Sequence, residues 1–296
     1  MTTDQVRDRT VLVTGGAGFI GGHLVDALAP ANTVRVLDHA VGANEALPPS
    51  VEVFEADVRD QDTVARAAAD VDLIFHEAAV VSVERSVADP RETNDVNLAG
   101  TMHVLEAARR EDARVVFASS AAVYGRPERV PIREGDVTRP LSPYGLQKLA
   151  ADEYCRLYHD LYGLETVPLR YFNAYGPGSS GGDYAGVITA FAQRLAAGDP
   201  LVVDGDGAQT RDFVHVEDLV RANLLAATTD AVGQAYNVGT GRSVSIRELA
   251  ETMAEVAATD VPIEHGPARP GDVPESEADI SRAREQLGYE PQVTLA

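Results

Sequence analysis

A glycine-rich turn near the N-terminus constrains this chain more than any other feature. An apolar strand at residues 10–13 runs into Thr-Gly-Gly-Ala-Gly-Phe-Ile-Gly, residues 14–21, and a helical pattern covers residues 21–29. Gly15, Gly18 and Gly21 allow a tight turn, close approach of the backbone to a pyrophosphate and close packing of the helix on the strand. The first helical turn, with Phe19 and Ile20, offers N–H groups to phosphate oxygens. In this strand–turn–helix context, the motif predicts a dinucleotide site.

Short apolar runs alternate with helical patterns through the first half of the chain. Further strands are expected at residues 33–37, 51–54, 73–75 and 114–117, and helices at 62–69 and 94–110. This alternation predicts an α/β fold of the Rossmann type, a doubly wound parallel sheet with right-handed crossovers.

The second half of the chain is less regular and suggests a second, smaller domain. Gly- and Pro-rich loops occupy residues 176–186 and 266–274. We expect residues 1–168 to form the cofactor-binding domain and residues 169–296 to form mainly the smaller domain, with about 212–238 packing back on the first.

Two acidic residues follow strands where the adenosine of a dinucleotide is expected. Asp38 ends the second strand, where a carboxylate accepts hydrogen bonds from ribose hydroxyls and repels a 2′-phosphate, which favours NAD over NADP. Asp57 and Val58 follow the third strand and mark an expected adenine pocket, although an aspartate after a strand is also common in turns.

Tyr144 and Lys148 are four residues apart, so a helix would place them on one face. A free tyrosine has a pKa of about 10, and a nearby ammonium lowers it. A surface lysine one turn from a packed tyrosine is the alternative. Lys148 is the only lysine among 25 basic residues, which favours a catalytic pair. The strand at 114–117 also delivers Ser120 to the carboxyl edge of the sheet, where ligands bind in open α/β folds.

Composition excludes several kinds of partner. The chain has 46 acidic residues and a net charge of −21, so it should repel nucleic acid and anionic membranes. It has no run of about 18 apolar residues that could span a membrane. A polar N-terminus and a single cysteine, Cys155, favour the cytoplasm. No Cys/His cluster has zinc spacing, so no metal is expected.

The same composition also bears on the salt concentration in which the protein works. An acidic chain with 24 arginines and one lysine is similar to the proteins of halophiles. A merely acidic composition of the high-GC type is the alternative. We favour the halophile interpretation, because high salt would mute the repulsion among so many carboxylates.

The combination of motifs resembles the extended short-chain dehydrogenase/reductase family, and the resemblance covers nearly the whole chain. It rests on the glycine loop, Asp38, the Ser120 segment and the Tyr144/Lys148 pair. It continues in further segments: His-Glu-Ala-Ala at 76–79, Asn97 with Gly100 and Thr101, residues 169–177, Arg-Asp-Phe-Val-His-Val at 211–216, and Arg-Pro-Gly-Asp at 269–272.

Within that family, the match that we read from the sequence is to UDP-glucose/UDP-N-acetylglucosamine 4-epimerases. Dehydratase and decarboxylase relatives carry acidic residues just after the active-site Ser/Thr, where this chain has Ala121 and Ala122. The implied cofactor is NAD, held by Gly15, Gly18, Phe19, Ile20, Gly21, Asp38, Asp57, Val58, Ala78, Tyr144 and Lys148. The implied substrate is a nucleotide sugar, held by Ser82, Ser120, Asn173, Arg211, Arg269, Asp272 and Ser276.

The resemblance also implies a mechanism. Tyr144, as a phenolate, takes the proton of the sugar C4 hydroxyl while NAD takes the C4 hydride, and Ser120 relays or orients the proton. The 4-keto sugar then rotates, and the hydride returns to its opposite face. A nucleotide-sugar reductase, an epimerase acting at another carbon and a non-catalytic NAD(H)-sensing protein share the cofactor site and stay open as alternatives.

Four further expectations concern assembly, specificity and the chain itself. Helices 94–110 and 144–162 have more apolar positions than one sheet-facing stripe requires, and relatives pair them into a homodimer. Ser276, four residues after Asp272, borders the sugar pocket in relatives and is small enough to admit an N-acetyl group.

Relatives continue into a final helix, so the second domain is expected to be truncated. Glu77 stands where the family's loop is usually uncharged, and the sequence offers no reason for it.

Overall fold

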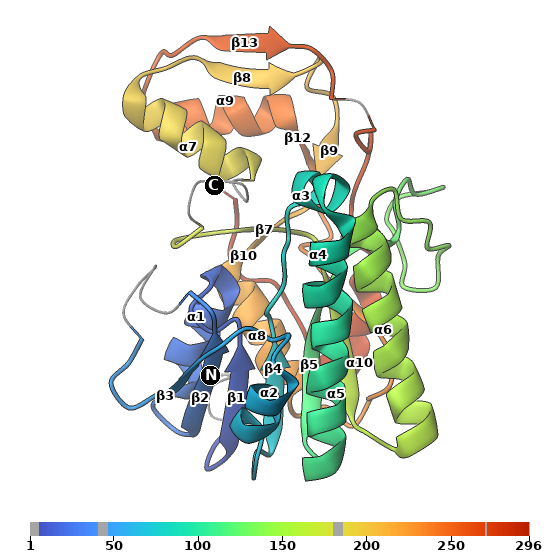
Figure 1. The fold of residues 1–296 in the computed structure, drawn as a ribbon. Coiled ribbons are helices and arrows are strands. Elements are labelled where there is room, and N and C mark those ends of the chain that lie inside the picture. Colours follow the sequence, from blue (N-terminus) through green and yellow to red (C-terminus); the bar gives the residue numbers. More distant parts are fainter. Residues whose placement is uncertain (1–5, 41–46, 180–185, 270, 296) are drawn as a thin grey trace.

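A parallel sheet of seven strands forms the centre of the structure (Figure 1). This computed structural model describes residues 6–40, 47–179, 186–269 and 271–295. The strand order is β11-β6-β5-β4-β1-β2-β3, and every neighbouring pair is parallel. The strands are β1 (Thr10–Thr14), β2 (Thr33–Asp38), β3 (Glu52–Glu55), β4 (Leu73–His76), β5 (Arg114–Ser120), β6 (Thr166–Tyr171) and β11 (Tyr236–Val238). The predicted doubly wound parallel fold is confirmed.

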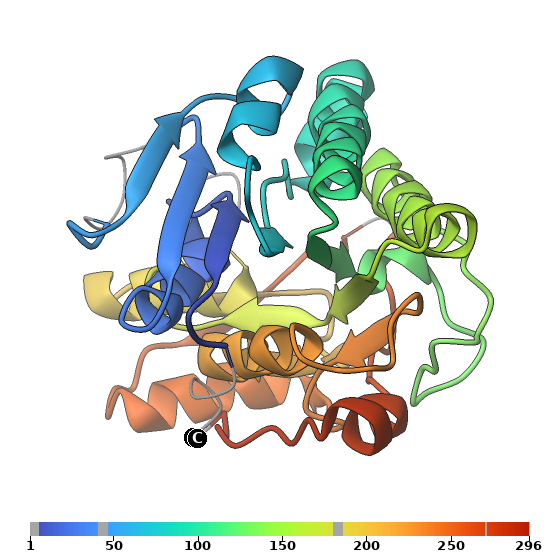
Figure 2. The same ribbon diagram turned by 90° about the horizontal axis from the view of Figure 1, so that it is seen from below.

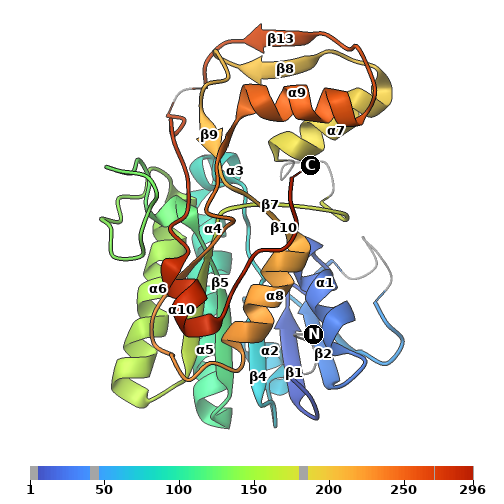
Figure 3. The same ribbon diagram turned by 180° about the vertical axis from the view of Figure 1, so that it is seen from behind.

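Helices cover both faces of this sheet and make three layers (Figure 2). One face carries α1 (Phe19–Leu28), α8 (Val216–Ala226) and α10 (Ser281–Leu287), as Figure 3 shows. The other face carries α2 (Gln61–Ala67), α5 (Gly100–Glu111) and α6 (Pro143–Tyr162). Leu24 and Leu219 belong to the core of the first face, and Leu105 and Ala151 to that of the second. Because both faces are covered, the central strands such as β1 and β4 are buried along nearly their whole length, whereas the edge strand β3 is largely exposed.

The helix expected at residues 94–110 is longer and less regular than predicted. It starts as α4 (Pro90–Asn94), passes through a π-helical turn (Asp95–Ala99) and continues as α5. The earlier start has a local cause: the Asp89 side chain accepts a hydrogen bond from the Glu92 N–H, and Pro90 occupies the first turn. The short helix α3 (Val83–Ala88) precedes it.

The rest of the second half stands over the carboxyl edge of the sheet (Figure 1). It contains three two-stranded pairs: β7 (Asn173–Tyr175) with β10 (Phe213–His215), β8 (Leu201–Asp204) with β13 (Ile263–Gly266), and β9 (Thr210–Arg211) with β12 (Val244–Ser245). Helices α7 (Val187–Ala197) and α9 (Ile246–Val256) pack on a separate small core that includes Phe191 and Leu249. Residues 180–185 and Pro270 of the two predicted loops lie outside the described residues.

Part of the second half belongs to the sheet layers. Helix α8 packs beside α1, and β11 pairs with β6. Among the helices of the described ranges, none combines the length and apolar character that crossing a bilayer requires.

Candidate active site

The glycine loop forms a cradle between β1 and α1. Gly15 has a φ of +72°, and a Cβ there would lie 2.7 Å from the main-chain nitrogen of Ala78. Gly21 packs so closely on the Gly15 carbonyl that a Cβ would overlap it. A Cβ on Gly18 would meet only that carbonyl, at 3.1 Å, so open space lies beside it. Helix α1 begins at Phe19 without a side-chain cap. The open cradle at a helix N-terminus fits the pyrophosphate of NAD.

The two acidic residues predicted to contact adenosine differ in their surroundings. The Asp38 carboxylate ends β2 and accepts a hydrogen bond from the main-chain nitrogen of Ala17, at 3.0 Å. It is therefore fixed at the glycine loop. The Asp57 carboxylate instead binds Arg59, with an N···O distance of 2.6 Å, and this hydrogen bond lowers the pKa of Asp57. Val58 is buried and supplies packing.

Buried polar contacts hold the loop that follows β4. Both ring nitrogens of His76 form hydrogen bonds: Nδ1 with Thr14 Oγ1, at 2.7 Å, and Nε2 with Thr101 Oγ1, at 2.9 Å. Burial lowers the pKa of His76 to about 3, so its ring is neutral. Asn97, in the π-helical turn, accepts from the Val80 N–H at 2.8 Å and donates to the Val80 carbonyl at 2.9 Å. The π-helical turn thus anchors this loop.

Ser120 and Tyr144 meet at the carboxyl end of β5. Ser142 caps α6 by accepting a hydrogen bond from the Gly145 N–H, at 3.1 Å, so the helix starts beside Tyr144. A Cβ on Gly145 would lie 2.7 Å from the Ala122 carbonyl oxygen, which shows how closely α6 approaches the Ser120 segment. Ser120 lies close enough to the buried Tyr144 phenol to act on its pKa, which it lowers.

Lys148 lies one turn further along α6 and is also buried. Its Nζ donates to the Ala118 carbonyl, at 2.7 Å, and lies 4.9 Å from the centre of the Phe117 ring. Burial lowers the pKa of Lys148 to about 8, with Glu77 opposing the shift.

The sequence-based expectation that Lys148 lowers the pKa of Tyr144 is not met. Burial raises the pKa of Tyr144, Glu77 adds to the increase, and Ser120 opposes it. The Lys148 ammonium donates to the Ala118 carbonyl oxygen, and Lys148 is not among the groups that shift the pKa of Tyr144. The positively charged nicotinamide ring of oxidised NAD, bound beside the phenol, would act in the opposite direction and lower the pKa of Tyr144.

A buried ion pair supports the catalytic segment from behind. Asp152, one turn after Lys148 on α6, accepts from Arg170 Nε at 2.7 Å and from Ser119 Oγ at 3.2 Å. Arg170 also donates to the Tyr124 hydroxyl, at 2.9 Å. These contacts join α6, β6 and the segment around Ser120, at the desolvation cost of burying two charges.

Two residues predicted to hold the nucleotide bind each other in this structure. Arg211, on β9, forms an ion pair with Asp272 and donates to the Val273 carbonyl, at 2.7 Å. Burial lowers the pKa of Arg211, and Asp272 opposes that shift. The Arg269 side chain is 66% exposed, and its Nε lies 3.6 Å from Asp204. A diphosphate would therefore have to draw Arg211 away from Asp272 or share it.

The other predicted substrate residues are separately placed. Asn173 is exposed and begins β7, a strand that lies between the two parts of the molecule (Figure 1). Ser82 is buried and caps α3 by accepting from the Arg85 N–H, at 3.1 Å. Ser276 is partly exposed, in the segment that leads from Asp272 to Ala278.

Comparison with known proteins places this geometry in a family. Residues 11–239 match the NAD dependent epimerase/dehydratase family. The chain belongs to this NAD-dependent epimerase/dehydratase family. It is 42% identical to a UDP-glucose 4-epimerase of Mycolicibacterium smegmatis, over 96% of this chain and 94% of that protein.

Two solved structures of similar proteins cover this member of the epimerase/dehydratase family almost completely. A UDP-N-acetylglucosamine 4-epimerase from Methanobrevibacter ruminantium, in complex with UDP-N-acetylmuramic acid, has a TM-score of 0.93 at 35% identity and covers 97% of this chain and 94% of its own. A UDP-glucose 4-epimerase of Thermus thermophilus, in complex with NAD, has a TM-score of 0.88 at 39% identity and covers 96% and 94%.

Sequence reasoning missed several buried groups of this epimerase/dehydratase. Tyr171 donates to Glu77 Oε1 at 2.9 Å, and Asn223 donates to the Tyr171 hydroxyl at 2.7 Å. Asp212 is buried and accepts hydrogen bonds from the main-chain nitrogens of Gly241 and Ala278, at 3.0 and 3.1 Å. The available signal in the sequence was the position of Asp212, which directly follows Arg211, the arginine predicted to bind phosphate.

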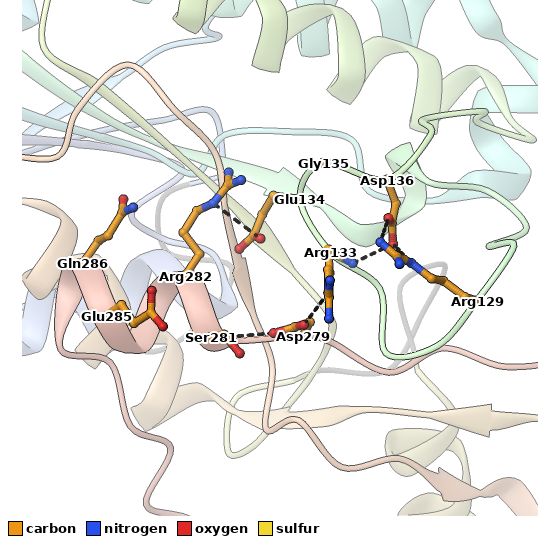
Figure 4. A pocket seen from close by; sticks show the side chains of 10 residues that line it. All are labelled: Arg129, Arg133, Glu134, Gly135, Asp136, Asp279, Ser281, Arg282, Glu285 and Gln286. Atoms are coloured by element: carbon orange, nitrogen blue, oxygen red, sulfur yellow. Dashed lines mark hydrogen bonds and ion pairs between the residues drawn. The ribbon is translucent and has the colours of Figure 1, made fainter.

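A polar surface pocket, drawn in Figure 4, is lined by none of these groups. It contains three arginines, and each is paired: Arg129 with Asp136, Arg133 with Asp279, and Arg282 with Glu134. None of the predicted site residues lines it. Because the arginines already have carboxylate partners, the pocket is a network of surface ion pairs that ties α10 to the loop at 129–136.

Proposed function

We propose that this epimerase/dehydratase family member catalyses the NAD-dependent epimerisation of a UDP-sugar, UDP-glucose or its N-acetylated equivalent, at C4. The observation that carries the proposal is the contact of Tyr144 with Ser120 beside Lys148, at the sheet edge next to the glycine loop. The names of the similar proteins support the substrate class.

In the proposed mechanism, the side chains move and hold the proton. When bound, NAD supplies the oxidant that takes two electrons from the sugar carbon and later returns them. Tyr144 accepts the C4 hydroxyl proton and gives it back, and Ser120 orients the exchange through its contact with the phenol. Lys148 keeps a positive charge at this edge. Ala121 and Ala122 carry no acid or base, which disfavours dehydration.

The sugar nucleotide is proposed to bind between the two parts of the molecule. Residues 1–168 would hold NAD, and residues 169–296 would supply Asn173, Arg211, Arg269 and Asp272 to the nucleotide. Arginine suits a diphosphate because its fork binds two oxygens at once.

A substrate panel tests this function. Purified protein is incubated with UDP-, GDP- and dTDP-sugars, and the stereochemistry of the products is determined by NMR. Interconversion of UDP-glucose and UDP-galactose, or of the N-acetylated pair, without consumption of added cofactor is the expected result. Stoichiometric loss of absorbance near 340 nm from added NADH would identify a reductase, and inversion at another carbon would identify a different epimerase.

We also propose a cytoplasmic homodimer. The only cysteine, Cys155, is buried as a free thiol, as suits a reducing compartment. Helices α5 and α6 lie side by side on the outside of the sheet (Figure 1). Helix α6 exposes the large apolar side chains of Leu146, Leu157, Leu161 and Tyr162.

A second copy of the chain would cover this face in an isologous interface. Light scattering in high salt should give twice the chain mass, and Leu161→Glu should give the chain mass. A monomeric wild type would contradict the proposal.

A further inference from the structure

Glu77 is an acidic residue placed where the crevice of the sheet opens. The strand order runs from β1 to β2 and β3 on one side and from β4 to β5 and β6 on the other, so the order reverses between β1 and β4. Ligands of open α/β sheets bind outside the carboxyl ends of the strands at such a point. Glu77 is the first residue after β4, and its N–H donates to the Thr14 carbonyl, at 3.0 Å. A Cβ on Gly15 would lie 2.9 Å from the Glu77 carbonyl carbon, so Glu77 touches the glycine loop.

The hydrogen bonds around Glu77 are arranged to stabilise a carboxylate. Asn223 uses its side-chain N–H groups on the Tyr171 hydroxyl, at 2.7 Å, and on the Leu219 carbonyl, at 2.9 Å. Because Leu219 offers an acceptor, the amide group of Asn223 points toward Tyr171 as a donor. The single proton of the Tyr171 hydroxyl is then available for Glu77 Oε1, at 2.9 Å. A chain of donors therefore ends on the Glu77 side chain.

The charge of Glu77 reaches both members of the catalytic pair. It raises the pKa of Tyr144 and opposes the lowering of the Lys148 pKa. Asp152 also acts on Lys148, but its charge is balanced by Arg170, at 2.7 Å. Of the two carboxylates that act on Lys148, Glu77 is therefore the one without an arginine partner among the described residues.

We propose that the Glu77 carboxylate is the counter-charge for the oxidised nicotinamide ring and shifts the redox balance of bound NAD toward the oxidised form. The oxidised ring carries one positive charge and the reduced ring carries none, so a carboxylate at Glu77 attracts the oxidised ring and not the reduced one. The inference rests on the proposed function, because it requires the ring to lie beside Tyr144 and Lys148.

This attraction has a consequence for catalysis. When two electrons and a proton pass from the sugar carbon to the ring, the ring loses its charge, and the hydroxyl proton passes to Tyr144. Glu77 opposes accumulation of the reduced cofactor with a keto sugar, the state from which an intermediate can escape. An epimerase needs its cofactor oxidised at the start of every turnover, and Glu77 would favour that state.

The test compares the dissociation constants of NAD⁺ and NADH on the same nucleotide-free, full-length chain by titration calorimetry. At a pH above the Glu77 pKa of about 7, where the carboxylate is ionised, Glu77→Gln removes the charge and keeps the shape. We expect it to weaken NAD⁺ binding relative to NADH by at least about tenfold, which for a two-electron couple corresponds to a rise of about 30 mV in the potential of the bound cofactor. In the working enzyme, the fraction of bound NADH at saturating UDP-glucose, read near 340 nm, should rise with it.

Two further variants separate charge from packing. Glu134→Gln neutralises a buried carboxylate paired with Arg282 in the pocket of Figure 4, and it should leave the NAD⁺/NADH ratio unchanged. Tyr171→Phe removes the donor to Glu77 and should move the ratio in the same direction as Glu77→Gln, by less.

The results that would overturn this inference differ from the result that would refute the proposed function. A ratio that is unchanged in Glu77→Gln, or equal weakening of both cofactor forms, would overturn the inference. If that variant does not fold, an unchanged ratio in Tyr171→Phe overturns it instead. A protein that binds neither NAD⁺ nor NADH would refute the proposed function itself.

Discussion

The Lys148 ammonium donates a 2.7 Å hydrogen bond to the Ala118 carbonyl, so the only lysine of the chain ties helix α6 to the end of β5. Ala118 lies two residues before Ser120, and Lys148 lies four residues after Tyr144. One contact therefore fixes the spacing between the proposed acid/base and its hydroxyl partner.

Lys148→Met should damage both catalysis and cofactor binding, because this side chain is proposed to serve both. Methionine fills similar space without the charge or the donor, so loss of packing is small. We expect turnover to fall on the order of 10²-fold and NAD affinity to fall with it. Steady-state kinetics and calorimetry measure the two effects. A variant that loses turnover but binds NAD normally would remove the cofactor role.

Tyr144→Phe should separate chemistry from binding. The substitution removes the proton acceptor and leaves the glycine loop and Asp38 untouched. We expect turnover to fall by about 10²–10⁴-fold, with NAD affinity close to that of the wild type. Near-normal turnover would exclude the proposed mechanism.

The partly buried carboxylate of Glu77 predicts a specific dependence of stability on pH. Burial raises its pKa from the ordinary value of 4.5 to about 7, while the Tyr171 hydrogen bond and the Lys148 charge oppose the shift. Between these two values the folded chain holds a proton that the unfolded chain has released, so the stabilisation from this group falls as the pH rises. Lys148 and Tyr144 on α6 and Tyr171 on β6 are the titratable groups around it.

Glu77→Gln cannot undergo this change. The free energy of unfolding of the variant, measured relative to wild type by urea denaturation, should therefore increase as the pH rises through this window. A difference that is flat or decreases from acid to neutral pH would show that Glu77 is not titrating as described.

Salt should stabilise the folded chain. At a net charge of −21 the carboxylates repel one another, and the screening length falls from about 10 Å at 0.1 M to about 3 Å at 1 M salt. We expect the melting temperature to rise between 0.1 and 2 M KCl, as the halophile interpretation requires. A flat or falling melting temperature would contradict that interpretation and leave the proposed enzyme activity intact.

The sheet and the catalytic pair were accessible from the sequence because local patterns encode them. The apolar run at residues 10–13 is short, rich in β-branched residues and followed by a glycine turn, which favours a buried strand. The spacing of Tyr144 and Lys148 selects one face of a helix. All five strands predicted for the first half are present.

The contacts that were missed join residues far apart in the chain. Tyr171 is 94 residues from Glu77, and Asp272 is 61 residues from Arg211. No local pattern reports such pairs, because strand order and loop closure bring them together. The pKa direction of Tyr144 was also inaccessible, since it depends on its burial and on where the Lys148 ammonium points.

The last prediction concerns the size of the sugar. Ser276 lies in a segment that is fixed at both ends: Asp272 binds Arg211, and the Ala278 N–H donates to the buried Asp212, at 3.1 Å. Such a segment holds its side chains in place, so a change of volume at Ser276 cannot be absorbed easily by movement of the backbone. The resemblance predicts that this position borders the sugar pocket, where the small serine would admit an N-acetyl group.

Ser276→Tyr should therefore reduce kcat/KM for UDP-N-acetylglucosamine by at least about tenfold more than that for UDP-glucose. Ser276→Ala, which keeps the side chain small, is the matched control and should retain both activities. Equal losses with both sugars would mean that the introduced aromatic ring disturbs the Arg211–Asp272 region in general. A wild type without activity on the N-acetylated sugar would place the limit on substrate size elsewhere in the pocket.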